Sequence, residues 1–132
     1  MNESTRIKPK KKFSKSRRLL RHADFERVYK QGRRHFAANM TVFYLARANG
    51  DTIGPRVGFT VSKALGGAVQ RNRMKRRLRE AVRLSGSSLD GAADVVINPK
   101  RSALVADFIE LQGEVSKAFQ VIGKNLQKGK PQ

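Results

Sequence analysis

The chain has 132 residues, with 29 Lys or Arg against 10 Asp or Glu, so its formal net charge at pH 7 is +19. This length is typical of one domain, and 39% apolar residues are enough for a hydrophobic core. The absence of cysteine excludes disulfide frameworks, zinc fingers, iron–sulfur sites and thiol nucleophiles. With no apolar signal segment and no stretch long enough to cross a membrane, we expect a cytoplasmic protein. Its positive charge favours a polyanionic partner. Nucleic acid is the leading candidate, and an anionic membrane surface is a weaker one.

Residues 1–21 are predicted to form a basic, disordered tail. Nine Lys and Arg residues occur between Arg6 and Arg21 without an acid, and such blocks repel themselves until a partner neutralises them. A solvated tail with nonspecific attraction and a tail with a defined contact are both compatible with this pattern. We expect a single RNA-binding α/β domain over residues 22–127 and a short basic tail over 128–132.

The first half of this domain is predicted to contain one helix and three strands. Residues 22–31 favour a helix with an apolar stripe, ending at Gly32 in a left-handed cap. A strand is predicted over residues 40–47, followed by an Asn-Gly turn and a second short strand that begins at Asp51. Residues 56–62 alternate between apolar and polar side chains, which predicts the third strand.

The second half is predicted to contain two helices around one strand. Residues 68–84 favour a helix, the apolar run at 94–98 favours a buried strand, and 107–126 carry an apolar stripe with helical spacing. The order αβββαβα predicts an α/β (α+β) sandwich with a small mixed sheet.

Residues 71–83 hold seven basic side chains and one acid, Glu80. At 100° per residue, Met74, Leu78, Ala81 and Val82 gather on one face that can dock on the sheet, and the basic side chains cover the flanks. Glu80 can pair with Arg76 or Arg77. A solvated helix face usually mixes charges of both signs, so this uncompensated repulsion favours binding of a polyanion. The excess of Arg over Lys suits bidentate contacts with phosphates.

The aromatic residues form a second candidate site. Phe25 and Tyr29 share one helix face, whereas the adjacent Phe43 and Tyr44 must point to opposite faces of their strand. Each of these residues could be plain core. An aromatic surface beside a basic helix, however, is how proteins hold unpaired nucleotides.

These residues resemble the protein subunit of bacterial ribonuclease P. The resemblance covers about residues 17–126. It rests on Asp24-Phe25 with Val28-Tyr29 and Gly32, on the strand and lysine over residues 56–63, and on Gly66, Ala68-Val69 and the Arg71-Asn72-Arg73 signature through Arg79. It implies a sandwich in the same element order, with a left-handed connection through the strand 56–62, the basic helix and the strand 94–98.

The resemblance also implies a function. Members of this family bind a catalytic RNA and the 5′ leader of precursor tRNA, and assist removal of the leader. The implied contacts with the RNA subunit are Arg71, Asn72, Arg73, Lys75, Arg76 and Arg79. The implied leader-binding cleft contains Phe25, Tyr29, Phe43, Thr60, Ser62 and Lys63. Ala64 departs from the family, whose members often carry a second Lys there, so we expect one leader or phosphate contact to be weaker.

We expect no catalytic residue in the protein itself. A protein-only nuclease needs clustered carboxylates, and the acids here are scattered along the chain. The resemblance implies that Mg²⁺ is held mainly by the RNA subunit, with Asn72 as the one candidate for a metal contact. The alternative function is that of a general RNA-binding, ribosome-associated or RNA-chaperone protein. A DNA-binding regulator is disfavoured, because no leucine heptads follow the basic helix and strands flank it.

Overall fold

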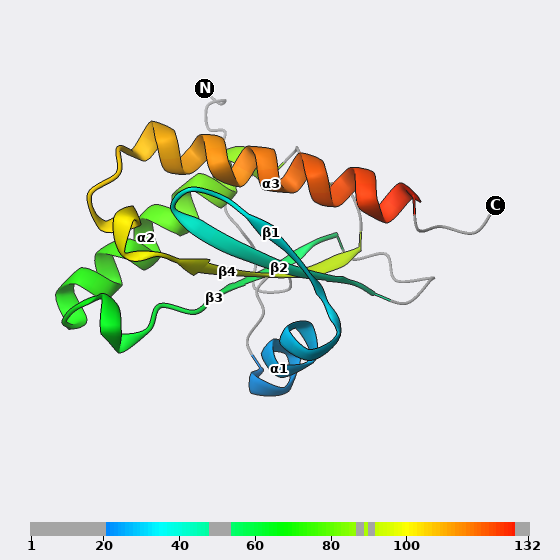
Figure 1. Ribbon diagram of the computed structural model, residues 1–132, viewed down its shortest axis with the longest axis horizontal. Helices are drawn as coiled ribbons and strands as arrows, with labels where there is room; N and C mark the ends of the chain where they lie inside the picture. Colours follow the sequence, from blue (N-terminus) through cyan, green and yellow to red (C-terminus); the bar gives the residue numbers. More distant parts are fainter. Residues whose placement is uncertain (1–20, 48–53, 87–88, 90–91, 129–132) are drawn as a thin grey trace, which may run out of the picture.

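The computed structural model describes residues 21–47, 54–86, 89 and 92–128. Within these residues, three helices and four strands occur in the predicted order αβββαβα (Figure 1). In chain order they are α1 (His22–Gln31), β1 (Arg33–Phe36), β2 (Met40–Ala46), β3 (Arg56–Phe59), α2 (Ala68–Ser85), β4 (Ala93–Pro99) and α3 (Phe108–Lys128). Two short 3-10 turns, η4 (Lys63–Leu65) and η6 (Arg101–Leu104), precede α2 and α3.

The four strands form one mixed sheet in the order β1-β2-β4-β3. β2 pairs with both β1 and β4 in the antiparallel sense, whereas β3 and β4 are parallel. A parallel pair of neighbouring strands requires a crossover, and here α2 provides it. The mixed sheet and the β3–α2–β4 unit agree with the predicted fold.

The main core lies between the sheet and two helices. Met74, Leu78, Ala81 and Val82 of α2 are buried there, as their spacing predicted, and so is the central part of the apolar stripe of α3. The opposite face of the sheet carries a smaller cluster, in which Val28 of α1 meets Val96 of β4. Figure 1 shows this division, with α1 on its own side of the sheet. We call the side that carries α1 the open face, because α1 covers only part of it.

The turn after α1 differs from the prediction. Gly32 adopts an extended conformation, with φ −83° and ψ 177°, so the predicted left-handed cap is wrong. The glycine is needed for a close approach instead, because a Cβ atom would lie 2.5 Å from the carbonyl oxygens of both Val28 and Tyr44. The absence of a side chain therefore lets the chain pass directly from α1 into the sheet.

The first strand is one that the sequence analysis did not predict. β1 consists of Arg33, Arg34, His35 and Phe36, and three of its four residues are exposed, so it carries no apolar alternation. The strand predicted to begin at Asp51 lies outside the described residues. β3 ends at Phe59, earlier than predicted, although the amide of Thr60 still donates a hydrogen bond to the carbonyl of Ile97 at 3.0 Å.

The predicted tails fall almost entirely on residues 1–20 and 129–132, which lie outside the described part of the chain. The domain boundaries at residues 21 and 127 therefore stay predictions. Within the described ranges, the helices are too short or too polar to cross a membrane.

Candidate nucleic-acid interface

Helix α2 carries the predicted RNA-subunit contacts on its solvent side. We call Arg71, Asn72, Arg73, Lys75, Arg76 and Arg79 the α2 ridge. Asn72, Arg73, Arg76 and Arg79 are exposed, while Arg71 and Lys75 are half-buried. Within the described part of the chain, Arg73, Arg76 and Arg79 make no ion pair or hydrogen bond through their guanidinium groups. These three cations are therefore available to a partner outside the fold.

Core packing and two arginine side chains fix the position of the helix that carries the ridge. The buried stripe of α2 packs against the sheet and α3, which fixes the rotation of the helix. Arg71 Nε donates a hydrogen bond to the carbonyl of Gly66 at 3.2 Å. Arg77 Nη1 donates to the carbonyl of Ala103 at 3.1 Å, and its Nη2 donates to Ala106. Arg77 thus ties α2 to the segment before α3 rather than facing a ligand.

The predicted partner of Glu80 was wrong. Glu80 pairs with Arg83, whose Nε donates to Glu80 Oε1 at 3.0 Å and whose Nη2 donates to Oε2. Arg77 donates its hydrogen bonds to backbone carbonyls instead, so Glu80 pairs with Arg83, three residues further along the helix. The hydrogen bond from Arg83 lowers the pKa of Glu80 against the opposing effect of burial. The one acid of α2 is therefore already neutralised and takes no charge away from the ridge.

The predicted aromatic residues come together on the open face. The rings of Tyr29 and Phe43 meet edge to face, with centroids 4.9 Å apart and planes at 87°. Phe25 and Phe43 both pack against the small cluster formed by Val28 and Val96. Tyr44 points to the main core, and its hydroxyl accepts a hydrogen bond from Asn125 at 2.7 Å. Phe43 therefore lies on the open face and Tyr44 on the core face of the sheet.

Polar groups surround this aromatic pair. The hydroxyl of Tyr29 lies 2.6 Å from Thr60 Oγ1 and donates to Asn98 Oδ1 at 3.0 Å. The guanidinium of Arg34 lies 5.6 Å from the centroid of Phe43. Asn98 and Arg34 were missed in the sequence analysis. Asn98 sits in a strand interpreted only as apolar, and Arg34 lies on the strand that was not predicted.

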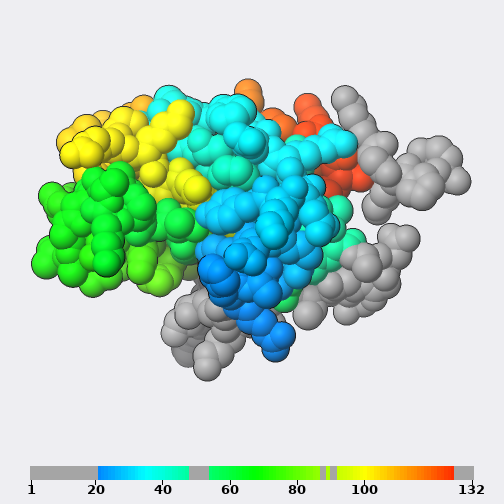
Figure 2. Space-filling model, turned by 60° about the horizontal axis from the view of Figure 1, so that its bottom comes forward, coloured from blue at the N-terminus to red at the C-terminus, as the bar shows by residue number. Residues whose placement is uncertain are grey.

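Ser62 and Lys63 lie between the open face and the ridge. Both are exposed, and they follow β3 at the start of η4, just before α2. Figure 2 views the molecule from this side, with α1 in blue and the segment around η4 and the first turns of α2 in green. The predicted leader contacts and RNA-subunit contacts therefore adjoin along the chain through η4.

A buried carboxylate fixes α1 to the sheet, and no sequence pattern indicated it. Asp94 of β4 is 0% exposed. It accepts hydrogen bonds at 2.8–3.0 Å from Arg27, Arg47 and Arg56. We call Asp94 and these three arginines the Asp94 cluster. Burial acts to raise the pKa of Asp94, but the hydrogen bonds of the arginines outweigh it, and the pKa lies below its ordinary value. Since Arg27 belongs to α1, this cluster positions Phe25 and Tyr29 over the sheet.

The donor atoms do not suit a metal ion held by the protein alone. In the described ranges, His, Asp and Glu side chains never gather in groups of three that could ligate a metal. Asp94 and Asp24 are engaged by arginines, and Glu80 by Arg83. The side-chain amide of Asn72 is exposed, and Asn72 belongs to no such group of ligating side chains among the described residues.

Comparison with known proteins gives a consistent result. The family model described as Ribonuclease P matches residues 13–123. The ribonuclease P protein component of Finegoldia magna is 43% identical over 91 residues, covering 68% of this chain and 76% of the relative. That of Citrifermentans bemidjiense is 42% identical over 107 residues, covering 81% and 89%.

Solved structures agree with the sequence relatives. The ribonuclease P protein of Staphylococcus aureus superimposes with a TM-score of 0.69 at 30% identity, covering 83% of this chain and 97% of that one. The protein from Thermotoga maritima gives a TM-score of 0.69 at 25% identity, covering 79% and 96%. The fold, the basic helix and these relatives together show that the chain belongs to the ribonuclease P protein family, whose members are components of an endoribonuclease ribonucleoprotein.

Proposed function

We propose that the α2 ridge binds the catalytic RNA subunit of ribonuclease P and that the open face binds the 5′ leader of precursor tRNA, in the cytoplasm. The observation that carries this proposal is the exposed ridge, whose three free guanidinium groups have no acid within the described part of the fold to neutralise them. Arginine forks suit the oxygens of a phosphate backbone. The aromatic pair of Tyr29 and Phe43 on the open face suits unpaired bases.

The two surfaces offer different chemistry. The ridge consists of five cations and one amide, so it fits a folded RNA that is recognised through its backbone. The open face combines aromatic rings with the hydrogen-bonding groups of Thr60 and Asn98, which fits a single strand with accessible bases. Ser62 and Lys63 can contact the phosphates of a strand that passes from one surface to the other.

We assign the chemical step to the RNA subunit. Hydrolysis of a phosphodiester needs a general base or metal ions held by clustered carboxylates. Among the described residues, Asp24, Asp94 and Glu80 are paired with arginines, and His, Asp and Glu side chains form no group of three that could hold a metal ion. Mg²⁺ would therefore be held mainly by the RNA. The protein's part is to supply positive charge and to position the substrate.

The test is cleavage of a precursor tRNA by a bacterial ribonuclease P RNA at low Mg²⁺, with and without this protein. We expect cleavage at the mature 5′ end only when the protein is present. Binding of both RNAs without any stimulation would instead support the alternative of a general RNA-binding or chaperone protein.

A second measurement separates the two surfaces. Phe25→Ala should weaken binding of precursor tRNA to the reconstituted enzyme and leave binding of mature tRNA nearly unchanged, because only the precursor has a leader. Equal losses for the two RNAs would contradict a leader site on the open face.

A further inference from the structure

The exposed side chain of Phe36 has no role in the fold or in the sites described so far. It is 66% exposed, although phenylalanine usually contributes to a core. It lies on the edge strand β1, directly opposite Thr41 of β2. Thr41 is a small neighbour, so a ring at this position keeps a face available to solvent.

The register of the sheet places Phe36 on the open face. Side chains two residues apart on a strand share a face, so Phe36 lies on the side of Arg34, whose guanidinium contacts the ring of Phe43. Continuing across the sheet, Thr41 stands opposite Asn98, which accepts the hydrogen bond of Tyr29. Phe36 therefore extends the aromatic surface of Tyr29 and Phe43 by one row toward the far end of β1.

The distance between Phe36 and Phe43 suits the binding of one more nucleotide. From the rise along a strand and the spacing between strands, the Cα atoms of Phe36 and Phe43 are about 8 Å apart. Consecutive bases of an extended single strand can therefore stack on the two positions in turn, which is how aromatic platforms hold such strands.

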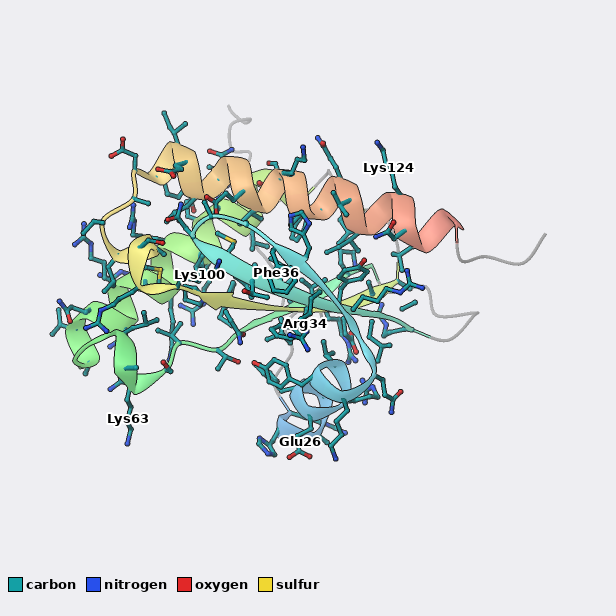
Figure 3. All side chains as sticks on the ribbon, viewed as in Figure 1. Glu26, Arg34, Phe36, Lys63, Lys100 and Lys124 are labelled. Carbon is teal, nitrogen blue, oxygen red and sulfur yellow. The ribbon has the colours of Figure 1, made fainter. Side chains whose placement is uncertain are left out.

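Positive charges lie on both sides of Phe36. Arg34 precedes it on the same face, and Lys100 Nζ donates a hydrogen bond at 2.9 Å to the carbonyl of Ala37, the next residue after Phe36. In Figure 3 the labels Lys100, Phe36 and Arg34 follow one another from left to right along the sheet, with Phe36 between the two cations. A ring between two cations matches a base flanked by two phosphates better than it matches an apolar protein partner.

We propose that Phe36 is a stacking platform for an additional unpaired leader nucleotide, one position beyond those held at Tyr29 and Phe43, with Arg34 and Lys100 contacting its flanking phosphates. This inference rests on the proposed function of the open face. It assigns to edge strand β1 a part in setting how much of the leader the protein can bind.

The test uses the enzyme reconstituted with a bacterial ribonuclease P RNA and precursor tRNAs whose leaders are shortened one nucleotide at a time. Affinities are measured for the wild type, Phe36→Ala, Phe36→Leu and Phe36→Trp. Ile109→Ala is the matched control, because Ile109 is 81% exposed and lies on α3, away from the open face. A 2-aminopurine placed at successive leader positions reports stacking through quenching of its fluorescence.

We expect Phe36→Ala and Phe36→Leu to weaken binding of long leaders about five- to tenfold, the lower range for loss of one base–aromatic stack. Leaders too short to reach Phe36 should bind all variants equally. Phe36→Trp and Ile109→Ala should behave as the wild type. Quenching should be lost in Phe36→Ala at one leader position only.

Three results would overturn the inference. If Phe36→Ala changes no leader affinity while Phe25→Ala does, the open face binds the leader but Phe36 takes no part. If Phe36→Ala weakens binding of the RNA subunit or of mature tRNA equally, Phe36 belongs to another contact. If the wild type binds precursor and mature tRNA equally, the proposed leader site itself is wrong, and the inference that rests on it is wrong too.

Discussion

Two groups of arginines in this protein have opposite relations to negative charge. The arginines of the Asp94 cluster converge on a carboxylate that is 0% exposed, and they join α1, β3 and the end of β2 to β4. The exposed arginines of the α2 ridge, Arg73, Arg76 and Arg79, form no ion pair in the described part of the chain, because the nearby Glu80 is paired with Arg83. One group finds its anion inside the fold, and the other presents its charge to solvent.

This difference shows why composition alone overstates a binding surface. The net charge of +19 counts both groups alike, yet of these two groups only the ridge presents guanidinium groups that form no ion pair within the described residues. Arg27 of the Asp94 cluster ties α1 to the sheet, so the proposed leader site on the open face depends on this cluster for the position of that helix. An arginine whose carboxylate lies inside the fold is thus structural, whereas one that forms no ion pair is the candidate for binding.

The largest effect should come from removing the buried carboxylate. Asp94→Asn leaves three arginines around a group that no longer carries charge, and breaking a buried ion pair in this way typically destabilises a fold by about 3–5 kcal/mol. Denaturation in urea would measure the loss. The matched control is Glu80→Gln, which removes an exposed carboxylate that pairs with one arginine, and we expect almost no change there. Similar losses for the two variants would contradict the contrast between the clusters.

The same carboxylate should make stability depend on pH. The pKa of Asp94 is lowered in the folded state, so the unfolded chain takes up the proton first as the pH falls. Its contribution is fully present above the unfolded pKa of about 3.9 and is lost as the pH drops toward the folded pKa. Urea unfolding between pH 5 and pH 2 should show a plateau at the upper end of this range and the decline below about pH 4.

Arg27→Met offers a sharper version of the pH experiment. It removes one of the hydrogen bonds that hold the pKa of Asp94 down, so the decline with acid should become shallower than in the wild type. An unchanged slope would mean that other carboxylates account for the pH dependence.

An intermediate effect is expected on the ridge. Arg76→Ala removes an exposed guanidinium with no internal partner among the described residues, so it should weaken binding of the RNA subunit by about 1–3 kcal/mol through the loss of a charge-assisted hydrogen bond. The unfolding midpoint should stay that of the wild type. The dependence of log affinity on log salt should also become shallower, by about 0.7–0.9 for each phosphate that the variant no longer neutralises. An unchanged affinity and slope would remove Arg76 from the interface.

Structural features could be predicted from the sequence where the interacting residues lie close together along the chain. The apolar stripe of α2 repeats within a few residues, so Met74 and Leu78 could be assigned to the core from spacing alone. The Asp94 cluster joins residues as far apart as Arg27 and Asp94, and no spacing rule relates them. Strand β1 was missed because its charged sequence has no alternation, and it is a strand only because β2 pairs with it.

The candidate site shows the same limit. Periodicity indicated that Phe25 and Tyr29 share a face, and the family resemblance added Phe43 and Thr60 to them. The structure brings Tyr29, Phe43 and Thr60 into contact and adds Asn98 and Arg34. Those two additions depend on the order of the strands in the sheet, which the sequence pattern does not specify.

The smallest effect should come from Arg77, which stands beside Arg76 on α2 but has its partners inside the fold. Arg77→Ala removes hydrogen bonds to the carbonyls of Ala103, which is buried, and of Ala106, which is half-buried, in the segment before α3. Water can replace the hydrogen bond to Ala106 more readily than the one to Ala103, so we expect a loss of stability of about 1 kcal/mol. RNA affinity should fall less than in Arg76→Ala, because the charge of Arg77 is turned toward the protein. If the two neighbouring variants weakened RNA binding equally, the internal hydrogen bonds of an arginine would not determine whether it belongs to the interface.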